Sequence, residues 1–278
     1  MGWGEAGYIP AAVDEHFKLG AKSLSQAIDE SSLRGERIIA VVASACSTAT
    51  GRYDNLQEIG ELCRMKGLWF HVDGAHGAAA LLSEKYRHLL AGVEQADSLV
   101  WDAHKMMLMP ALITAVLFRD GKNSTKPFCT QASYIFEKDA EEEWFNLGHR
   151  TMECTKSMLA MKLYLCLKCL GTNFFAQYVE RTFDITRAFA AMLKGCADFE
   201  LGAEPESNII CFRYLGSDLH PTDELQAAIR ARMLQDGSFY IVQTRLPQGL
   251  FLRCALMNPL TSENDLEALL VKIRELAR

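Results

Sequence analysis

Two short segments of the chain carry the side chains most suited to chemistry. The first, HVDGAHG, places the carboxylate of Asp73 among residues with small side chains, and the second, SLVWDAHKMM, carries Lys105 about one helix and one strand later. A lysine in an apolar neighbourhood can lose its proton and form a Schiff base with a carbonyl group. A carboxylate that faces a pyridinium nitrogen keeps that ring protonated, and small neighbouring residues leave room for a flat ring. The two segments together therefore suggest a site for pyridoxal phosphate.

Each of these residues also fits a purely structural role. Asp73 could cap the N-terminus of a helix that begins at AAALL, and Lys105 could be a solvated loop lysine. The spacing alone leaves both interpretations open. His71 is expected in the core, and Cys166 and Cys169 are expected to pack there too, because no second pair of metal ligands accompanies them. We expect no metal site.

The elements that must position these residues follow from the hydrophobic pattern. Apolar runs bounded by polar or small residues predict strands, and apolar residues at helical spacing predict helices. The predicted strands are 37–45, 68–73, 98–102 and 112–118, and the predicted helices between them are 55–67 and 78–90. This alternation indicates crossover units and a parallel sheet covered on both faces. Ligands bind such sheets at the carboxyl ends of the strands, where Asp73, Asp102 and the segment 44–48 lie.

The second half of the chain follows a different pattern. Two long helices are predicted at 151–170 and 174–193, separated by Gly171, and short strands and two further helices follow. This order is typical of an α+β layer. We therefore place a domain boundary near residue 155, inside a helix, which divides the chain into domains 1–155 and 156–278.

Composition narrows the class of protein. The chain has 278 residues, of which 49% are hydrophobic and 23% charged, so it can bury a sizeable core. Its formal net charge of −6 argues against a nucleic-acid partner, and no apolar run is long enough to span a membrane. The nine cysteines show no disulfide-framework spacing, which favours a cytoplasmic protein with reduced thiols.

The sequence from AVVASACSTATG to WDAHKMM resembles the group II pyridoxal-phosphate-dependent decarboxylases, which act on glutamate, diaminobutyrate, cysteine sulfinate or aromatic amino acids. The segments ASYIFEKD, RTMECTK and LRCALMNP extend the resemblance from about Pro10 to the C-terminus. It implies an α/β fold of fold type I, with part of the large, parallel-rich domain and a small C-terminal α+β domain. It also implies pyridoxal phosphate as cofactor, decarboxylation of an L-amino acid, and a homodimer in the full-length form.

The resemblance assigns roles to individual residues. Lys105 is the Schiff-base lysine, Asp73 the partner of the ring nitrogen, and Ala75 the residue against one face of the ring. His104 and Ser44, the latter at a position where the family usually has Thr, are cofactor contacts. Asp102 joins this set where the family usually has Asn, and its charge would repel a phosphate unless it points elsewhere. The cofactor-binding set is Lys105, Asp73, Ala75, His104, Ser44 and Asp102.

Three further positions depart from the family pattern. His76 stands where the family has Trp or Tyr, and Lys156 stands where the glutamate enzymes have an arginine that binds the substrate carboxylate. Lysine keeps that charge without the two-pronged geometry, and Lys156 could equally be a solvated surface lysine. Phe145 aligns with the loop tyrosine that delivers a proton to the carbanion, which suggests an aldehyde as product. The alternative is that Phe145 only packs its loop.

The family carries a long upstream portion, with a phosphate cradle and a ring-stacking side chain, that this sequence does not match. We therefore expect a fragment of a longer protein. Within enzymes the alternative is a class V aminotransferase, which the DAHK and RTMECTK segments disfavour. Outside enzymes the alternative is a catalytically inactive remnant that acts as an interaction module.

Overall fold

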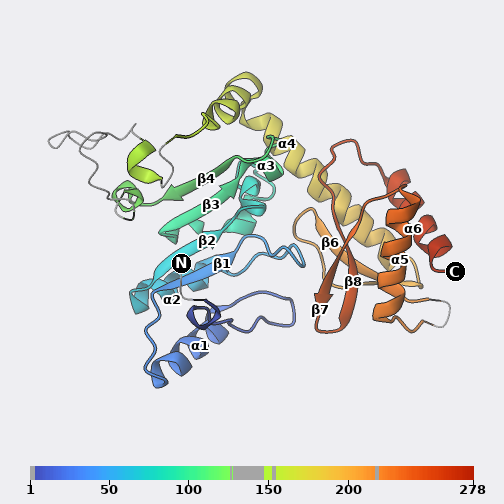
Figure 1. The fold of residues 1–278 in the computed structure, drawn as a ribbon, viewed down its shortest axis with the longest axis horizontal. Helices are drawn as coiled ribbons and strands as arrows, with labels where there is room; N and C mark the ends of the chain where they lie inside the picture. Colours follow the sequence, from blue (N-terminus) through green and yellow to red (C-terminus); the bar gives the residue numbers. More distant parts are fainter. Residues whose placement is uncertain (1–3, 126, 128–146, 152–154, 217–218) are drawn as a thin grey trace.

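The computed structural model describes residues 4–125, 127, 147–151, 155–216 and 219–278. Figure 1 shows two β-sheets joined by one long helix. The first sheet has the order β1-β2-β3-β4, and the second has the order β5-β6-β8-β7. The strands of the first sheet are β1 (Ala40–Ser44), β2 (Trp69–Asp73), β3 (Ser98–Asp102) and β4 (Thr114–Phe118). The strands of the second sheet are β5 (Phe199–Leu201), β6 (Ile209–Tyr214), β7 (Val242–Leu246) and β8 (Gly249–Ala255).

The first sheet confirms the predicted crossover pattern in its first three strands. β1 pairs with β2 and β2 with β3 in parallel, whereas β4 returns antiparallel to β3. The helices of this half are α1 (Ala21–Leu33), α2 (Leu56–Lys66) and the short α3 (Ala103–Met106). Helix α2 lies where the sequence predicted it, because the Asn55 side chain caps its start and Gly67, with φ 65°, ends it.

The prediction that this sheet is covered on both faces is wrong for the described residues. In β1, Val41 and Ala43 are buried, while Ala40 and Val42 are exposed. The buried side chains belong to the core that the sheet shares with α1 and α2. Because alternate residues of a strand point to opposite faces, one face of β1 packs on this core and the other is open.

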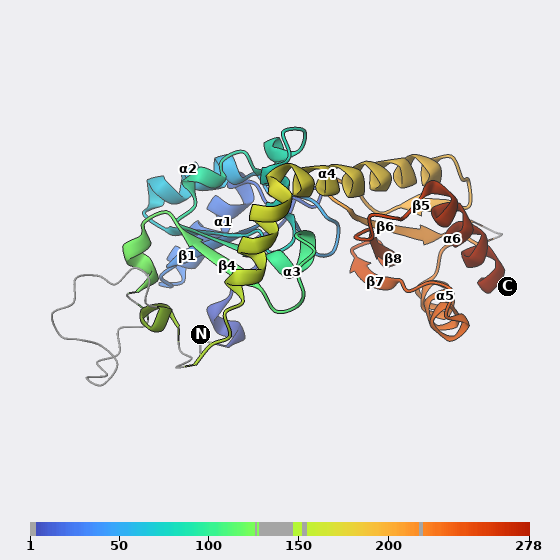
Figure 2. The same ribbon diagram turned by 90° about the horizontal axis from the view of Figure 1, so that it is seen from above.

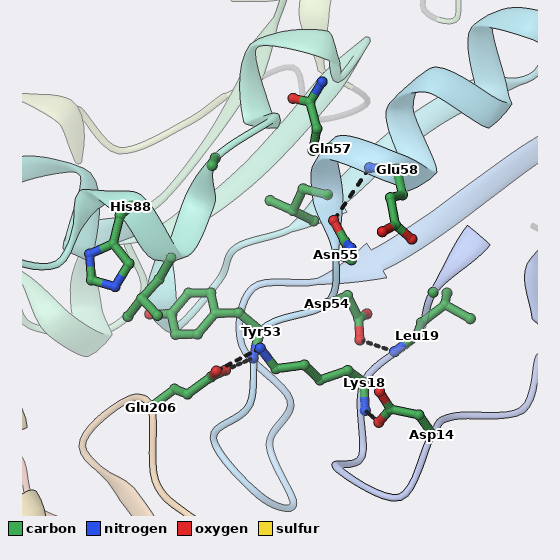
Figure 3. A pocket seen from close by; sticks show the side chains of 14 residues that line it. Asp14, Lys18, Leu19, Tyr53, Asp54, Asn55, Gln57, Glu58, His88 and Glu206 are labelled. Atoms are coloured by element: carbon green, nitrogen blue, oxygen red, sulfur yellow. Dashed lines mark hydrogen bonds and ion pairs between the residues drawn. The ribbon is translucent and has the colours of Figure 1, made fainter. Parts of the chain in front are cut away.

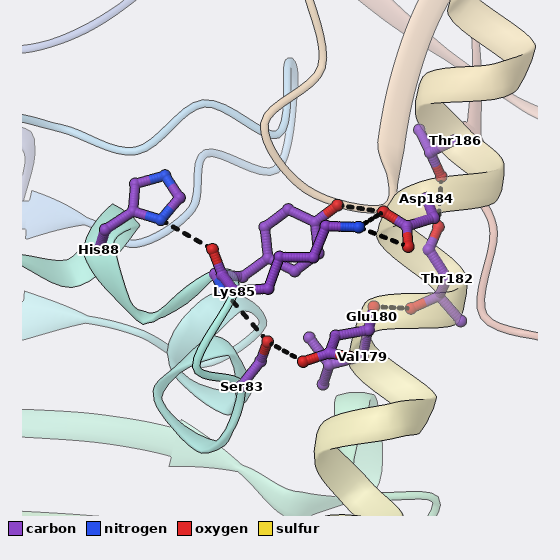
Figure 4. Close-up of polar contacts among 9 residues, drawn as sticks. Ser83, Lys85, His88, Val179, Glu180, Thr182, Asp184 and Thr186 are labelled. Atoms are coloured by element: carbon purple, nitrogen blue, oxygen red, sulfur yellow. Dashed lines mark hydrogen bonds and ion pairs between the residues drawn. The ribbon is translucent and has the colours of Figure 1, made fainter.

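The predicted helix over 78–90 is also wrong. The segment forms two 3-10 turns, η2 (Gly77–Leu82) and η3 (Arg87–Leu90), separated by the extended residue Ser83. Figure 4 shows how side chains of this segment bind the long helix α4. The Ser83 hydroxyl donates to Glu180 at 2.6 Å, and Lys85 pairs with Asp184 at 2.6 Å. These contacts hold the segment against α4.

Helix α4 (Ala160–Lys194) spans both halves of the molecule, as Figure 2 shows from above. Gly171, with φ 77° and ψ 166°, is non-helical inside it, which confirms the predicted break between two long helices. Phe183 still belongs to the core of the first sheet, and Phe189 belongs to the core of the second. Helix α4 begins at Ala160 and not at 151, so residue 155 lies in a bend before the helix and the prediction that it lies inside one is wrong. The domain boundary itself stays a prediction.

The second sheet is antiparallel throughout and packs against helices α5 (Asp223–Asp236) and α6 (Glu263–Leu276). Thr222 caps α5, and Ser262 caps α6 in a capping box with Asp265. These elements lie where the sequence predicted an α+β layer. Within the described residues, no helix is long and apolar enough to cross a membrane.

Candidate functional site

The carboxyl ends of the first three strands bring the predicted site residues to one edge of the sheet. Ser44 is the register partner of Asp73, and Asp73 is the partner of Val100. One step further on, the backbone N–H of Asp102 donates to the carbonyl of Ala75 at 3.0 Å. Residues separated by up to 58 positions in the sequence, between Ser44 and Asp102, are therefore neighbours along this edge.

Lys105 lies on α3, directly after β3, and forms an ion pair with Asp102. Its Nζ is 2.9 Å from Asp102 Oδ2, and the Thr114 hydroxyl donates to Asp102 Oδ1 at 2.6 Å. Burial by itself raises the Asp102 pKa, but the hydrogen bonds from Thr114 and Lys105 and the charges of Lys105 and His104 bring it below its ordinary value. Asp102 therefore holds the lysine. The Lys105 side chain is 38% exposed, so it is partly accessible from solvent.

The His104 ring is held by the backbone of Ile113, the residue directly before β4. Its Nδ1 lies 2.9 Å from the Ile113 carbonyl oxygen and 3.1 Å from the Ile113 nitrogen, and which contact is the hydrogen bond depends on the tautomer. Its Nε2 is 3.6 Å from Asp102 Oδ2. In either tautomer Nδ1 is taken, so only Nε2 is left to contact a ligand.

Asp73 is exposed at the end of β2. Its Oδ1 accepts the backbone N–H of Ala75 at 3.1 Å, while the N-cap of the next turn, η2, is His76. The alternative that Asp73 caps that turn is therefore wrong. For Oδ2 no hydrogen-bond partner is found in the part of the chain that the structure describes. One carboxylate oxygen is thus available at the same edge as Lys105.

The small residues beside Asp73 serve packing more than ligand access. A methyl group added at Gly74 would lie 2.7 Å from Leu99 Cδ1, and one added at Gly77 would lie 2.7 Å from the Ala45 carbonyl oxygen. Real Cβ atoms do not approach this closely, so both glycines are required by the neighbouring strands. Ala75, which is only half-buried, is the small residue that remains free to face a ring.

His71 lies elsewhere than expected. Its ring is half-buried, and its Nδ1 is 2.7 Å from the Ser98 hydroxyl, so the prediction of a core histidine is wrong. Burial lowers the His71 pKa, and the nearby charge of Asp73 partly opposes that effect. His71 therefore lies on the open face of β2, two residues before Asp73 and close to the site edge.

The other residues with predicted roles are Lys156, Cys166, Cys169 and Phe145. Lys156 is exposed, and its Nζ is 3.2 Å from the Thr151 hydroxyl. Cys166 packs against the first core, whereas Cys169 is exposed, so core packing was correct for Cys166 only. Phe145 lies outside the described residues.

Two functional candidates were missed by sequence reasoning. Asn208 is fully buried, and its Oδ1 lies 2.7 Å from Nε2 of His76. The charge of Arg253, on β8, acts on the same histidine, together with that of Lys105. The Arg253 Nε is buried without a hydrogen-bond partner among the described residues. The segment LRCALMNP, which carries Arg253, was noted only as a landmark.

A polar cavity of about 520 Å³ opens elsewhere, between the N-terminal segment and α2 (Figure 3). Lys18 pairs with Glu206 at 2.6 Å, and the Tyr53 backbone N–H donates to the same carboxylate at 2.9 Å. Asp54 accepts the N–H groups of Leu19 and Ser44, at 2.8 and 2.6 Å. These polar groups bind one another through hydrogen bonds and an ion pair. The residues that line the cavity do not include Lys105 or Asp73. The cavity wall anchors the end of β1 and lies apart from the site edge.

A lysine that follows a strand of a parallel sheet, with a carboxylate at the end of the neighbouring strand and a second α+β layer, agrees with the fold-type-I arrangement that the sequence resemblance implied. Residues 5–215 match the family described as the pyridoxal-dependent decarboxylase conserved domain. The chain belongs to this family. The family's cofactor is pyridoxal phosphate.

Individual relatives agree. The chain is 30% identical over 268 residues to an aromatic-L-amino-acid decarboxylase of Bacillus atrophaeus, covering 95% of this chain and 56% of that protein. It is 30% identical to an acidic amino acid decarboxylase of Mus musculus, covering 100% of this chain and 53% of that protein. The crystal structure of mouse CSAD in apo form matches with a TM-score of 0.86 and 27% identity, over 96% of this chain and 57% of that one. The chain spans about half the length of the relatives it matches.

The chemistry of the site edge fits the family's cofactor at its ring and its carbonyl group. Lys105 offers a partly exposed side chain that ends in an amine, Asp73 an unpartnered carboxylate oxygen, and Ala75 a small surface. For the Ser44 hydroxyl, no hydrogen-bond partner is found across the described ranges, so it is available as a donor. Asp102 points to Lys105 and Thr114, so its carboxylate is paired with a cation, and its role as a cofactor contact stays a prediction.

Proposed function

We propose that this chain carries the lysine-bearing part of a pyridoxal-phosphate-dependent decarboxylase that acts on an L-amino acid. The observation that carries the proposal is the placement of Lys105 and Asp73 at the carboxyl ends of neighbouring parallel strands. When bound, pyridoxal phosphate supplies a sink for the electrons left behind when a carboxyl group departs as CO2. The remaining steps depend on the side chains of the chain itself.

Lys105 is the amine that would hold the cofactor and release it to an incoming amino group. Asp102 would hold the protonated amine at the strand end through the 2.9 Å ion pair, and the nitrogen must give up a proton before it can bond to a carbonyl carbon. Asp73 would hold a proton on the ring nitrogen through its free oxygen, because an anion close to a base stabilises the protonated form. Ala75 would support one ring face, and the hydroxyl of Ser44 and Nε2 of His104 would contact polar ring substituents or phosphate.

Arg253 is the residue that we assign to the substrate carboxylate. Its Nε lacks a hydrogen-bond partner among the described residues, and its charge reaches His76 beside the site edge. A guanidinium binds a carboxylate with two parallel hydrogen bonds, which suits an α-carboxylate that must be oriented before it leaves. Lys156, exposed and bound to Thr151, has less support for this role.

Capture of the cofactor tests the proposal directly. We expect borohydride treatment of the protein with pyridoxal phosphate to place the pyridoxyl mass on Lys105, as located by peptide mapping. Lys105→Arg should abolish this label, and Lys85→Arg, which removes a surface lysine of η2–η3 paired with Asp184, should not. A label spread over surface lysines, with none concentrated at Lys105, would show that the assignment is wrong.

Asp73→Asn separates a ring-nitrogen partner from a structural residue. An opposite charge within a few ångströms moves a pKa by roughly 1–3 in favour of the charged form, so the variant should lose protonation of the bound ring. The absorbance of the bound cofactor as a function of pH reports this loss. An unchanged titration would leave Asp73 as a turn residue that only binds the Ala75 N–H.

A second candidate function is an interaction module without catalysis, which the open face of β1 favours. The capture experiment separates the two, because a module of this kind would not concentrate the label at Lys105. We further propose that the full-length protein is a homodimer. The exposed apolar side chains at the start of α4 support it: Met161, Tyr164 and Leu165. We also propose residence in the cytoplasm, which the unpaired cysteines among the described residues support.

A further inference from the structure

The buried amide of Asn208 connects the second sheet to both turns of the site edge. Its Oδ1 is 2.7 Å from Nε2 of His76, which directly follows Ala75. Its Nδ2 is 3.3 Å from the sulfur of Met106, which directly follows Lys105. The same Nδ2 donates to the Leu256 carbonyl at 3.3 Å, and the Asn208 carbonyl accepts the Leu256 N–H at 2.8 Å. One side chain directly before β6 of the second sheet therefore touches the neighbours of Ala75 and of Lys105.

These contacts determine which nitrogen of His76 carries the proton. A carbonyl oxygen and a thioether sulfur only accept hydrogen bonds, so the amide group that faces Leu256 and Met106 must be the NH2. The amide oxygen then faces His76, and Nε2 of the imidazole must donate to it. In the neutral ring this leaves Nδ1 as an acceptor, and in the described ranges no partner for Nδ1 is found.

The surroundings keep this imidazole neutral. Burial lowers the His76 pKa most, and the hydrogen bond to Asn208 opposes that effect. From the neighbouring elements, the positive charges of Lys105 on α3 and Arg253 on β8 lower the pKa further, and the negative charge of Asp102 raises it. A neutral acceptor thus lies beside two cations at the site edge.

We propose that Asn208 is a positioning residue: it holds the turn after β2 and the turn after β3 from the second sheet, and it locks His76 in the Nε2–H tautomer. The relevance of the lock to catalysis rests on the proposed function. The lock itself is a property of the protein without cofactor. Docking of the second sheet and the geometry of the site edge then depend on the same side chain. Removing the Asn208 amide would release both turns.

The first test uses the full chain without cofactor, with histidine labelled for nuclear magnetic resonance. We expect the His76 ring to show the Nε2–H tautomer. Asn208→Asp, which places an anion against Nε2–H, should raise the His76 pKa, and Asn208→Leu, which removes the acceptor, should lower it. Gln226→Met is the matched control: Gln226 is also fully buried and binds β6 through its amide, at 2.7 Å to the Tyr214 carbonyl. It should leave the His76 pKa unchanged.

The second test measures capture of pyridoxal phosphate at Lys105 by borohydride and peptide mapping. Asn208→Leu should weaken capture at least about tenfold, because small displacements of a reacting group cost this much or more. Gln226→Met should remain within about twofold of the unaltered protein. If Asn208→Leu does not fold, the isosteric Asn208→Asp decides through the rise in the His76 pKa.

The outcomes separate the inference from the proposed function. An Nδ1–H tautomer would show that Asn208 does not fix the tautomer of His76. A His76 pKa that stays unchanged in both Asn208 variants would show the same. If His76 shows the Nε2–H tautomer but Asn208→Leu captures pyridoxal phosphate as well as the unaltered protein, the positioning role is overturned. If the unaltered protein shows no capture at Lys105, the proposed function fails, and the measurements without cofactor still decide the lock.

Discussion

Strands β1 and β6 have similar sequences and opposite environments. β1 lies within RIIAVVASA and β6 within NIICFRY, and each run suggests a strand buried on both faces. In β6, Ile209, Ile210, Cys211 and Phe212 are all at most 1% exposed, whereas in β1 Val42 is 56% exposed and Val41 only 5%. The same type of run is fully enclosed in one sheet and half enclosed in the other.

The difference comes from what packs on each face. Ile210 and Phe212 contact the core under α5 and α6, while Cys211 belongs to a small cluster that Phe17 and Ala49 of the first half cover. For β1, the described residues cover one face only. The second sheet is therefore the more fully enclosed region. The first sheet combines a tightly packed face with an open one, next to the residues suited to chemistry.

The largest effect should come from breaking the closed region. Phe212→Ala removes a fully buried ring whose centroid lies 5.3 Å from that of Phe189 and 6.2 Å from that of Phe199. We expect a loss of about 3–5 kcal/mol in the free energy of unfolding, from lost burial and the cavity left behind. Denaturant unfolding measures it. A loss below about 1 kcal/mol would contradict a tightly packed core around Phe212.

A smaller effect should come from overpacking the closed side of the first sheet. In Gly77→Ala the added methyl group would lie 2.5 Å from the Tyr53 hydroxyl and 2.8 Å from the Cys46 nitrogen. We expect a destabilisation of about 1–3 kcal/mol, because the strand ends must shift. Gly121→Ala is the control, since nothing lies within 4 Å of its added methyl group. Equal unfolding midpoints for the two variants would contradict the packing role of Gly77.

The alternation within β1 gives the sharpest comparison of the two faces. Val41→Ala removes buried methyl groups and should cost about 1–2 kcal/mol. Val42→Ala, one residue later on the open face, should change the free energy of unfolding by no more than about 0.5 kcal/mol. Equal costs for both valines in thermal or denaturant unfolding would show that the second face is covered in solution.

The smallest effect concerns an ion pair of the closed region and its dependence on pH. Arg274 on α6 binds Asp198 through two nitrogens, at 2.6 and 2.9 Å, and the hydrogen bond from Arg274 lowers the Asp198 pKa. A carboxylate whose folded pKa is lowered contributes stability above its unfolded pKa of about 4, and this contribution is lost as the pH falls through the folded value.

Arg274→Gln should therefore cost at most about 1 kcal/mol at pH 7, because both side chains are partly exposed. The difference between the variant and the unaltered protein should shrink as the pH is lowered from 5 towards about 3. Unfolding curves across this range provide the measurement. A difference that stays constant with pH would assign the cost to lost packing of the guanidinium over the Phe199 ring, 5.0 Å away.

The sequence by itself determined the local elements and the chemical residues. Asn55 and Gly67 bound α2, Gly171 breaks α4, and the run of strands and helices predicts a sheet whose carboxyl ends carry Asp73 and, just beyond β3, Lys105. These features depend on nearby residues: caps, backbone freedom and hydrophobic periodicity act within a few positions. That is why they could be predicted without the fold.

Only the tertiary structure decided how these residues are supported. Whether Val42 is covered, whether Ser83 interrupts a helix to bind Glu180, and whether Asp102 faces a phosphate or Lys105 depend on partners that the local pattern does not contain. Asn208 was missed for the same reason, because His76 lies 132 residues before it. A hydrogen bond across that separation exists only once two sheets have docked, and no spacing along the chain can indicate it.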